Sequence, residues 1–207
     1  MSSFKKFVHY YQANLAVSLH GLDADAIEKA VNTLWSAYQK DKQIFICGNG
    51  GPAALSAYIA SDIARGTAIR GRRKFRLIGL TENGPLLRVR SDNAGPAGCF
   101  KEQLENLLKR GDVVVGISVS GDPENIARAF GYARSRGATT IGIAGSGGGK
   151  LEKLADITIS ISSREYEIVE DIQLCLGHII KRALQEFLKY DKSKRIRKQP
   201  LPVSTHR

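Results

Sequence analysis

The stretch GDVVVGISVSGDPEN, residues 111–125, decides the fold because it joins an apolar run to a polar loop and a helix start. The β-branched residues between Asp112 and Ser118 predict a buried strand. Asp122 and Pro123 then predict the first residues of a helix. A buried strand that leads through a short loop into a helix is the repeating unit of a parallel α/β sheet.

The same unit recurs along the rest of the chain. Further apolar runs predict strands over residues 43–47, 75–80, 139–144 and 156–161. Helical spacing predicts helices between and after these strands, over residues 52–65, 97–109, 123–136, 149–154 and 166–188. Strands that alternate with helices predict an α/β fold, with a doubly wound five-stranded parallel sheet flanked by helices.

Further segments lie before and after this sheet. Two N-terminal helices are expected ahead of the first strand, over residues 3–19 and 23–41. The helical periodicity stops after Lys189, where basic residues and prolines follow. We therefore expect a single domain with its N-terminal helices over residues 1–190 and a basic flexible tail over residues 191–207.

Composition narrows the class of protein. The chain has 207 residues, of which 43% are hydrophobic and 25% are charged, as is typical of one folded globular domain. No apolar run approaches the roughly 18 residues that a membrane span needs, and the N-terminus lacks a signal-peptide core. We therefore expect a cytoplasmic protein with no membrane partner. Cys47, Cys99 and Cys175 form no CxxC pair, which argues against a disulfide framework and a structural zinc site.

The formal net charge is +11, and two basic clusters carry much of it. One is the tail, and the other consists of Arg65, Arg70, Arg72, Arg73, Lys74 and Arg76. Each cluster could be a solvated surface or could face an anion. Because the sequence has no recognition-helix motif and no groove of interleaved aromatic residues, we expect nucleic acid to make only non-specific contact, through the tail.

Two loops are candidates for ligand binding, because ligands of open parallel sheets bind beyond the carboxyl ends of the strands. CGNGGP, residues 47–52, offers glycines that let the backbone approach a ligand, and SVSGDPEN, residues 118–125, offers two serine hydroxyls. Free N–H groups at the start of the following helices favour an anion. Both loops could instead be ordinary tight turns. Neither has the spacing of a dinucleotide fingerprint or a Walker loop, so a small phosphate fits better than a nucleotide.

Four segments of the chain carry a family resemblance. They are CGNGGPAALSAYIASDIARG at 47–66, LTEN at 80–83, the segment 111–156, and IVEDIQLCLGHII at 168–180. Together they resemble the SIS (sugar isomerase) domain family, and within it the phosphoheptose isomerase group. The resemblance implies a phosphosugar ligand. It also implies a homotetramer in which the helical N-terminal segments pack together and the active sites lie at subunit boundaries.

By position, the resemblance implies that both loops bind the phosphate and the rest of the substrate. The implied residues are Asn49, Gly50, Gly51, Ser118, Ser120, Gly121 and Asn125. The isomerase pattern also has a serine after the double glycine, where this chain has Pro52. One phosphate donor of the family is therefore missing.

The implied catalytic positions also depart from the family pattern. The family places a metal-binding histidine four residues before a catalytic glutamate, and this chain has Tyr58 and Asp62 there, still on one helical face. On the last helix, a glutamine followed eight residues later by a histidine becomes Glu170 and His178. Between these two stands Gln173, where the group often has another histidine. An Asn-Asp pair of the family appears reversed, as Asp92 and Asn93.

An aldose–ketose isomerase needs a base to move a proton between adjacent carbons and an acid at the carbonyl oxygen. By resemblance, Asp62 is the base and His178 the acid, and with Glu170 they could bind zinc or another divalent metal. The lost histidine leaves a metal-free site as an alternative. Each residue also has a structural alternative: His178 in the core or at an interface, Asp62 paired with Arg65, and Tyr58 in the core.

Two functions from different classes follow from these residues. The first is an aldose–ketose isomerase acting on a sugar phosphate of the sedoheptulose 7-phosphate type. The second is a non-catalytic SIS module that binds a phosphosugar or acts as a regulatory or interaction scaffold. The changes at Pro52, Tyr58, Asp62 and Gln173 keep the second function open.

Overall fold

The computed structural model describes residues 2–84, 87, 95–145 and 149–191. Its centre is a sheet with the strand order β2-β1-β3-β4-β5. The strands are β1 (Gln43–Gly48), β2 (Arg76–Gly79), β3 (Val113–Ser118), β4 (Thr139–Ala144) and β5 (Ile157–Ser160). Every neighbouring pair runs parallel, so the predicted five-stranded parallel sheet is confirmed.

The sheet has a hydrophobic core on each face. β3 is the middle strand, and all six of its residues are buried. Because successive side chains of a strand point to opposite faces, Ile44 and Ile46 of β1 pack in one core, and Phe45 and Cys47 pack in the other. A sheet that is apolar on both faces needs helices on both.

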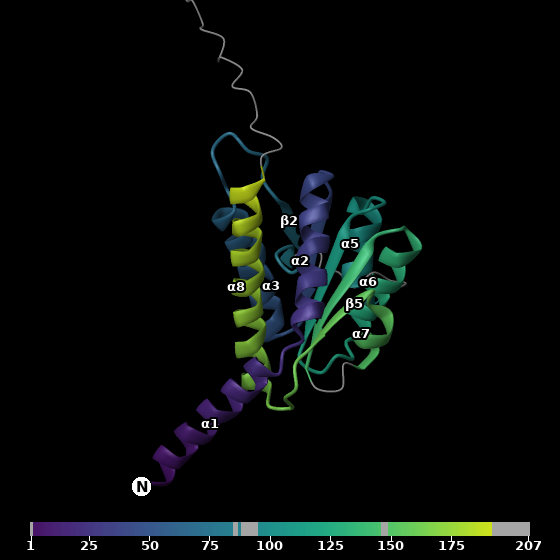
Figure 1. Cartoon of the computed structure of the whole chain (residues 1–207). Helices are drawn as coiled ribbons and strands as arrows, with labels where there is room; N and C mark the ends of the chain where they lie inside the picture. The colour runs from purple at the N-terminus through teal and green to yellow at the C-terminus, as the bar shows by residue number, and fades with distance from the viewer. Residues whose placement is uncertain (1, 85–86, 88–94, 146–148, 192–207) are drawn as a thin grey trace, which may run out of the picture.

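Helices cover both faces of the sheet (Figure 1). One face carries α2 (Ala24–Gln39), α3 (Gly51–Gly66) and α8 (Tyr166–Tyr190). The other carries α5 (Cys99–Leu107), α6 (Glu124–Ser135) and α7 (Gly149–Leu154). This arrangement confirms the doubly wound fold. The helix expected over residues 97–109 is shorter than predicted, because a 3₁₀ turn, η1 (Pro96–Gly98), precedes α5 and the helix ends at Leu107.

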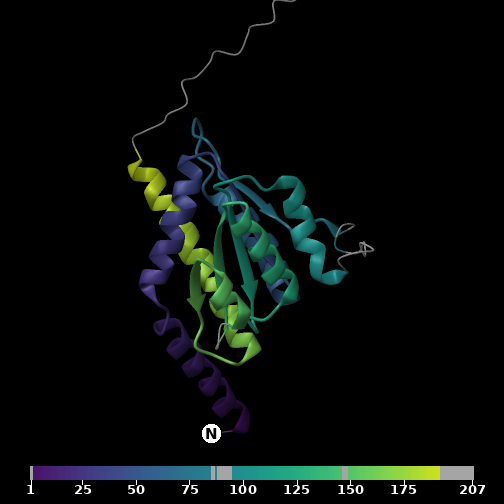
Figure 2. The ribbon, with the colours of Figure 1, turned by 90° about the vertical axis from the view of Figure 1, so that its right-hand side faces the viewer.

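The first helix, α1 (Ser3–His20), projects from the body of the molecule in both views (Figures 1 and 2). It is attached at the start of α8, where the Tyr11 hydroxyl donates to Asp171 Oδ2 (2.7 Å) and Asn14 Nδ2 donates to Glu165 Oε1 (3.0 Å). Apolar side chains along α1 remain exposed; Phe4, for example, is 73% exposed. This helix therefore offers an apolar surface that the described part of the chain does not cover.

Arginines of the second basic cluster bind the chain itself. Arg72 donates to the carbonyl oxygens of Leu188 (2.6 Å) and Asp191 (2.7 Å) and thereby holds the end of α8. Arg73 lies over the Tyr38 ring, 5.6 Å from its centroid. These contacts give part of the cluster a structural role, whereas Arg70 and Lys74 are exposed to solvent.

Some of the predictions fall outside the described residues. Asp92 and Asn93 lie there, and so do residues 192–207 of the basic tail. The division into a domain over 1–190 and a tail over 191–207 stays a prediction. Within the described residues, no helix is both long enough and apolar enough to cross a membrane.

Candidate functional site

The two candidate loops meet where the winding of the sheet changes direction. β1 and β3 are neighbours, but α3 and α6, the helices that follow these two loops, lie on opposite faces of the sheet. Asn49 Nδ2 donates to Asn125 Oδ1 (2.8 Å), and Asn125 Nδ2 donates to Asn49 Oδ1 (2.9 Å). Such a switch point is the usual ligand site of a doubly wound sheet. The structure therefore joins the two loops that the sequence singled out.

The loop after β3 is organised around its two serines. Ser118 Oγ accepts a hydrogen bond from the Gly121 N–H (3.1 Å), and Ser120 Oγ accepts one from the Asp122 N–H (3.3 Å). The two hydroxyl oxygens are 3.5 Å apart. Each oxygen also lies within hydrogen-bond reach of the other hydroxyl, and both hydroxyl protons can turn from this mutual contact to a bound anion. Gly121 has a φ of +75°, a left-handed conformation that suits glycine in this turn.

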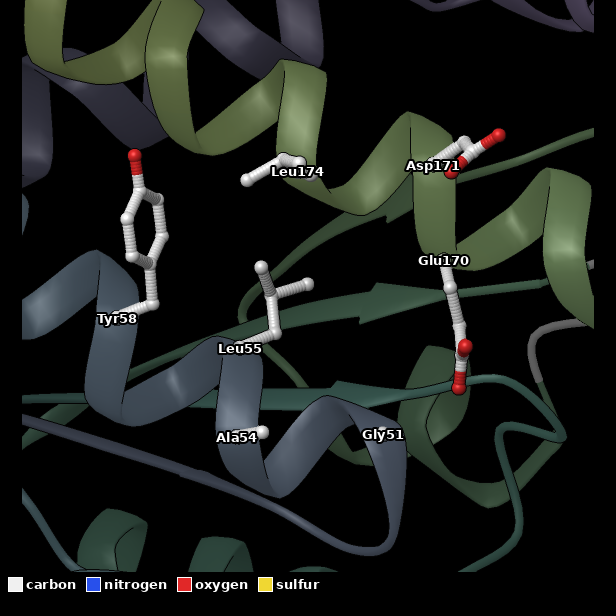
Figure 3. Close-up of a pocket in the computed structure, with 7 residues that line it drawn as sticks. All are labelled: Gly51, Ala54, Leu55, Tyr58, Glu170, Asp171 and Leu174. Atoms are coloured by element: carbon white, nitrogen blue, oxygen red, sulfur yellow. The ribbon is translucent and has the colours of Figure 1, made fainter.

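The loop after β1 already faces a carboxylate. Glu170 of α8 lies so close to Gly51 that a Cβ at this position would overlap Glu170 Oε1 (Figure 3). Gly51 is the first residue of α3, so the carboxylate lies at the positive end of that helix. A phosphate placed there would be repelled by the like charge. This contact favours the Ser118 loop as the phosphate site and argues against phosphate contacts at Gly51.

A groove of about 520 Å³ runs between α3 and α8. Leu55 and Leu174 face each other across it, and Tyr58 and Glu170 stand at its two ends (Figure 3). The full lining consists of Gly51, Ala54, Leu55, Tyr58, Glu170, Asp171 and Leu174. The groove thus has apolar walls and polar ends, as is typical of sites that bind small organic molecules.

Tyr58 and His178 form a polar contact between the two helices that border the groove. The Tyr58 hydroxyl is 3.0 Å from His178 Nε2. Tyr58 is 44% exposed, and so is the side chain of His178, so neither residue belongs to the hydrophobic core. A phenol and an imidazole in contact can exchange a proton with each other or with a bound molecule.

Asp62 lies behind this pair and is held by cations. Lys181 Nζ is 2.7 Å from Asp62 Oδ2, Arg65 is 3.5 Å from Oδ1, and His178 Nε2 is 4.0 Å from Oδ2. The carboxylate is only 6% exposed, and the hydrogen bond from Lys181 is the main cause that lowers its pKa. A carboxylate with a lowered pKa is a weaker base, so the geometry gives Asp62 a poorer fit to the role of base than the sequence predicted.

Lys181 is the functional residue that sequence reasoning missed. A lysine on an amphipathic helix is usually part of its solvated face. Its spacing was nevertheless a signal, because Lys181 follows His178 by three residues and therefore lies on the same face of α8.

Gln173 of α8 forms a hydrogen bond with the end of β3, where the phosphate-candidate loop begins. It is fully buried, and its Nε2 donates to the carbonyl oxygen of Ser118 (2.9 Å). Among the described residues, its Oε1 is a buried oxygen with no hydrogen-bond partner. Gln173 thus positions Ser118 and keeps one acceptor available.

The three residues predicted as metal ligands do not converge. Glu170 and His178 are eight residues apart on α8, about 12 Å along a helix axis, and Glu170 turns toward Gly51. Within the described part of the chain, no three His, Cys, Asp or Glu side chains are grouped so that they could hold a metal. Zinc needs three or four ligands at about 2.0 to 2.3 Å. The residues present do not fit a three-ligand site, and we derive no step through a metal.

Comparison with known proteins identifies the family of this chain. The family model of the SIS domain matches residues 9–145, about two thirds of the chain. The chain belongs to the SIS domain family. The predicted resemblance is therefore confirmed, and the Ser118 loop and the start of α3 lie within the matched region.

Relatives and solved structures give the same family and fold. The chain is 35% identical over 150 residues to a phosphoheptose isomerase of a Nitratiruptor species. These residues are 72% of this chain and 80% of the relative. A structure of a phosphoheptose isomerase from Francisella tularensis has a TM-score of 0.81 and 21% identity, over 90% of this chain and all of that one. The sugar isomerase domain of an RpiR transcription factor from Sphaerobacter thermophilus has a TM-score of 0.67 and 18% identity. The match covers 91% of this chain and 93% of that one.

The ion pair of Asp62 makes stability depend on pH. Asp62→Asn leaves Lys181 without its partner, so we expect the free energy of unfolding near neutral pH to fall by about 2 kcal/mol. The pKa of Asp62 is lower in the folded chain than its ordinary value of 3.8, so the carboxylate stabilises the fold above that pH. This contribution is lost as the pH falls through the folded-state pKa.

Denaturant unfolding near neutral pH and in steps below about pH 4 measures this dependence. The difference between parent and Asp62→Asn should shrink in acid. Glu186→Gln is the control, since Glu186 pairs with Lys189 on the exposed surface of the same helix and should change stability by less than about 1 kcal/mol. A difference that stays constant in acid would contradict the role given to the ion pair.

Proposed function

We propose that this chain is a sugar-phosphate isomerase acting on a phosphosugar of the sedoheptulose 7-phosphate type. The relative from Nitratiruptor, named a phosphoheptose isomerase, supports the substrate class because it is 35% identical and matched over 80% of its length. The observation that carries the proposal is the contact between Tyr58 and His178 at one end of the groove. Two groups able to transfer protons thus lie at the end of a groove whose volume is large enough for a small phosphosugar.

Substrate binding is divided between two parts of the site. The phosphate binds at Ser118 and Ser120, where hydroxyl protons and the backbone at the start of α6 favour an anion. The sugar extends past the Asn49–Asn125 pair, whose amides can exchange their mutual hydrogen bonds for bonds to hydroxyl groups. The reacting carbons then lie toward α3 and α8, away from the phosphate.

The reaction moves a proton between adjacent carbons through an enediol. His178 removes and returns this proton, because its imidazole is partly exposed and imidazole is the side chain suited to proton transfer near neutral pH. Tyr58 donates its hydroxyl proton to the carbonyl oxygen as the enediol forms, and it regains a proton from the neighbouring hydroxyl as the enediol collapses to the product. Asp62 stays ionised and stabilises the imidazolium that forms at 4.0 Å.

Proton exchange tests the catalytic proposal. Parent protein in deuterated water should exchange a C1 proton of ketose phosphates or the C2 proton of aldose phosphates, in the heptose or hexose series, as followed by proton NMR. His178→Ala should slow this exchange by about 100-fold or more, because it removes the proton-transfer group, and Tyr58→Phe should slow it by a smaller factor. Tyr190→Phe, which changes an exposed tyrosine at the far end of α8, serves as the control.

The outcome separates the two candidate functions. Absence of exchange in the parent across that panel, with phosphosugar binding retained, would favour a non-catalytic phosphosugar-binding module. Pro52, which lacks the hydroxyl of the family serine, is the observation that favours this second function. Equal loss of exchange in Asp62→Asn and His178→Ala, with both variants folded, would return the role of base to Asp62.

Substrate affinity tests the phosphate site. Changing both Ser118 and Ser120 to alanine should weaken phosphosugar binding about 30-fold, or about 2 kcal/mol, since two hydrogen bonds to a charged acceptor are lost. Isothermal titration calorimetry measures this change. Ser135→Ala, at the opposite end of α6, should leave affinity unaltered. Unchanged affinity in the double variant would show that the phosphate binds elsewhere.

We also propose that the chain forms a homotetramer through its N-terminal helices. Phe4, Phe7 and Val17 of α1 are between 59% and 73% exposed, so α1 has apolar surface that a second copy could bury. The cytoplasmic location expected from the sequence stays a prediction.

Light scattering tests the assembly. At micromolar concentration the mass should be about four times that of the 22.6 kDa chain. Phe4→Ser combined with Phe7→Ser should reduce it, because the apolar contact surface is lost. The parent running at the mass of one chain would refute the tetramer. Leu107→Ser, an exposed leucine on α5, is the matched control.

A further inference from the structure

A lysine stands beside the carboxylate that the family pattern would offer to a metal. Lys181 Nζ is 2.7 Å from Asp62 Oδ2, the same oxygen that lies 4.0 Å from His178 Nε2. We propose that the Lys181 ammonium takes the place of a divalent cation at this centre, so that Tyr58 and His178 work beside a resident lysine instead of a metal. The claim goes beyond the isomerase proposal, because it concerns what this cluster binds.

The first support is the set of donors around the lysine. A zinc ligand bond requires an oxygen or nitrogen lone pair within about 2.2 Å of the ion. A cation bound to Asp62 Oδ2 would also lie close to the ammonium that this oxygen already binds, and like charges at that separation repel strongly in a partly buried site. Tyr58, at the position of the family histidine, offers a neutral phenol instead of an imidazole.

The second support is that Lys181 is packed into place. Its side chain is only 19% exposed, whereas Lys189 on the same helix is 62% exposed. The aliphatic part of Lys181 crosses Gly66 at the end of α3, where a Cβ would lie 3.0 Å from Lys181 Cδ. The absence of a side chain at Gly66 therefore leaves room for the lysine. This is an ordered interhelical contact and not a solvated surface charge.

The third support is that the substitutions fit one another. Asp62 has a carboxylate one methylene shorter than the family glutamate, and this carboxylate is 6% exposed, between α3 and α8. A buried carboxylate is stable only with a partner, and Lys181 supplies a positive charge of its own. A metal would be a second and competing source of charge.

Lys181 acts as a positioning residue in this arrangement. It contacts Asp62, and Asp62 in turn faces His178, so the lysine holds the charge that orients the imidazole. Charge that is already in place needs no rearrangement during the reaction.

Metal titration tests the proposal without relying on turnover. Chelator-treated parent, Lys181→Met and Lys181→Arg are titrated with Zn²⁺ by calorimetry and with Co²⁺ by visible absorption. Methionine keeps much of the aliphatic packing against Gly66 but removes the charge, so Lys181→Met should bind the ions about 10-fold or more tightly than the parent. Lys181→Arg should remain like the parent. Lys189→Met controls for the loss of an α8 lysine, and circular dichroism verifies that each variant is folded.

A second variant tests the proposal even if Lys181→Met alone binds the metal too weakly to be measured. Tyr58→His combined with Asp62→Glu and Lys181→Met restores the family residues and removes the lysine, so it should bind Co²⁺ in about one equivalent per chain with a visible d–d spectrum. Parent protein that binds one Zn²⁺ per chain at micromolar or lower concentration, with binding lost in Asp62→Asn, would overturn the proposal. Folded Lys181→Met and triple variants that gain no affinity would overturn it as well.

The exchange assay adds a readout that a merely structural lysine would not change. Parent exchange should be insensitive to chelator, and Lys181→Met should lower kcat with little effect on KM, with partial rescue by Lys181→Arg. If the parent shows no exchange at all, the isomerase proposal fails, and the metal titrations still decide the proposal about Lys181.

Discussion

The ion pair between Asp62 and Lys181 is the interaction on which the rest of the site depends. It joins α3 to α8 about one helical turn beyond Tyr58, past the end of the groove, and both side chains are largely buried. A carboxylate that is 6% exposed would be costly to keep ionised without a partner. Because this pair fixes the two helices against each other, it also fixes the separation between Tyr58 on α3 and His178 on α8. The distance between Tyr58 and His178 therefore depends on the neighbouring ion pair between Asp62 and Lys181.

α8 contacts several parts of the site, so its position affects all of them. One face of this 25-residue helix carries Glu170 against the start of α3, Gln173 against the end of β3, and His178 against Tyr58. Both ends of the helix are held in turn, by Asn14 of α1 at its start and by Arg72 at its end. A shift of α8 would move the loop after β3, proposed to bind phosphate, together with the contact between Tyr58 and His178. The two halves of the site are mechanically linked.

The sequence predicted the fold well because the apolar runs are unambiguous. β4 was expected over the residues it occupies, and each helix was placed within a few residues, since burial on both faces leaves little freedom for the strands. The site was predicted only in part. The two loops follow from topology, but the contact of Glu170 with Gly51 and the pairing of Lys181 with Asp62 depend on how α3 packs on α8. No local pattern in the sequence specifies that packing.

Departures from the family pattern lie beside charged side chains at two places in the site. Pro52 removes a hydroxyl at the start of α3, and Glu170 brings a carboxylate to that same helix end, so the charge preference there changes from phosphate to a neutral or hydroxyl-bearing group. Tyr58 removes an imidazole, and Lys181 supplies the cation that Asp62 needs. If the family residues had been lost without any replacement, the buried Asp62 carboxylate would have no partner. An unpaired buried charge is strongly destabilising. This pairing supports the proposal that the substitutions belong to an altered chemistry.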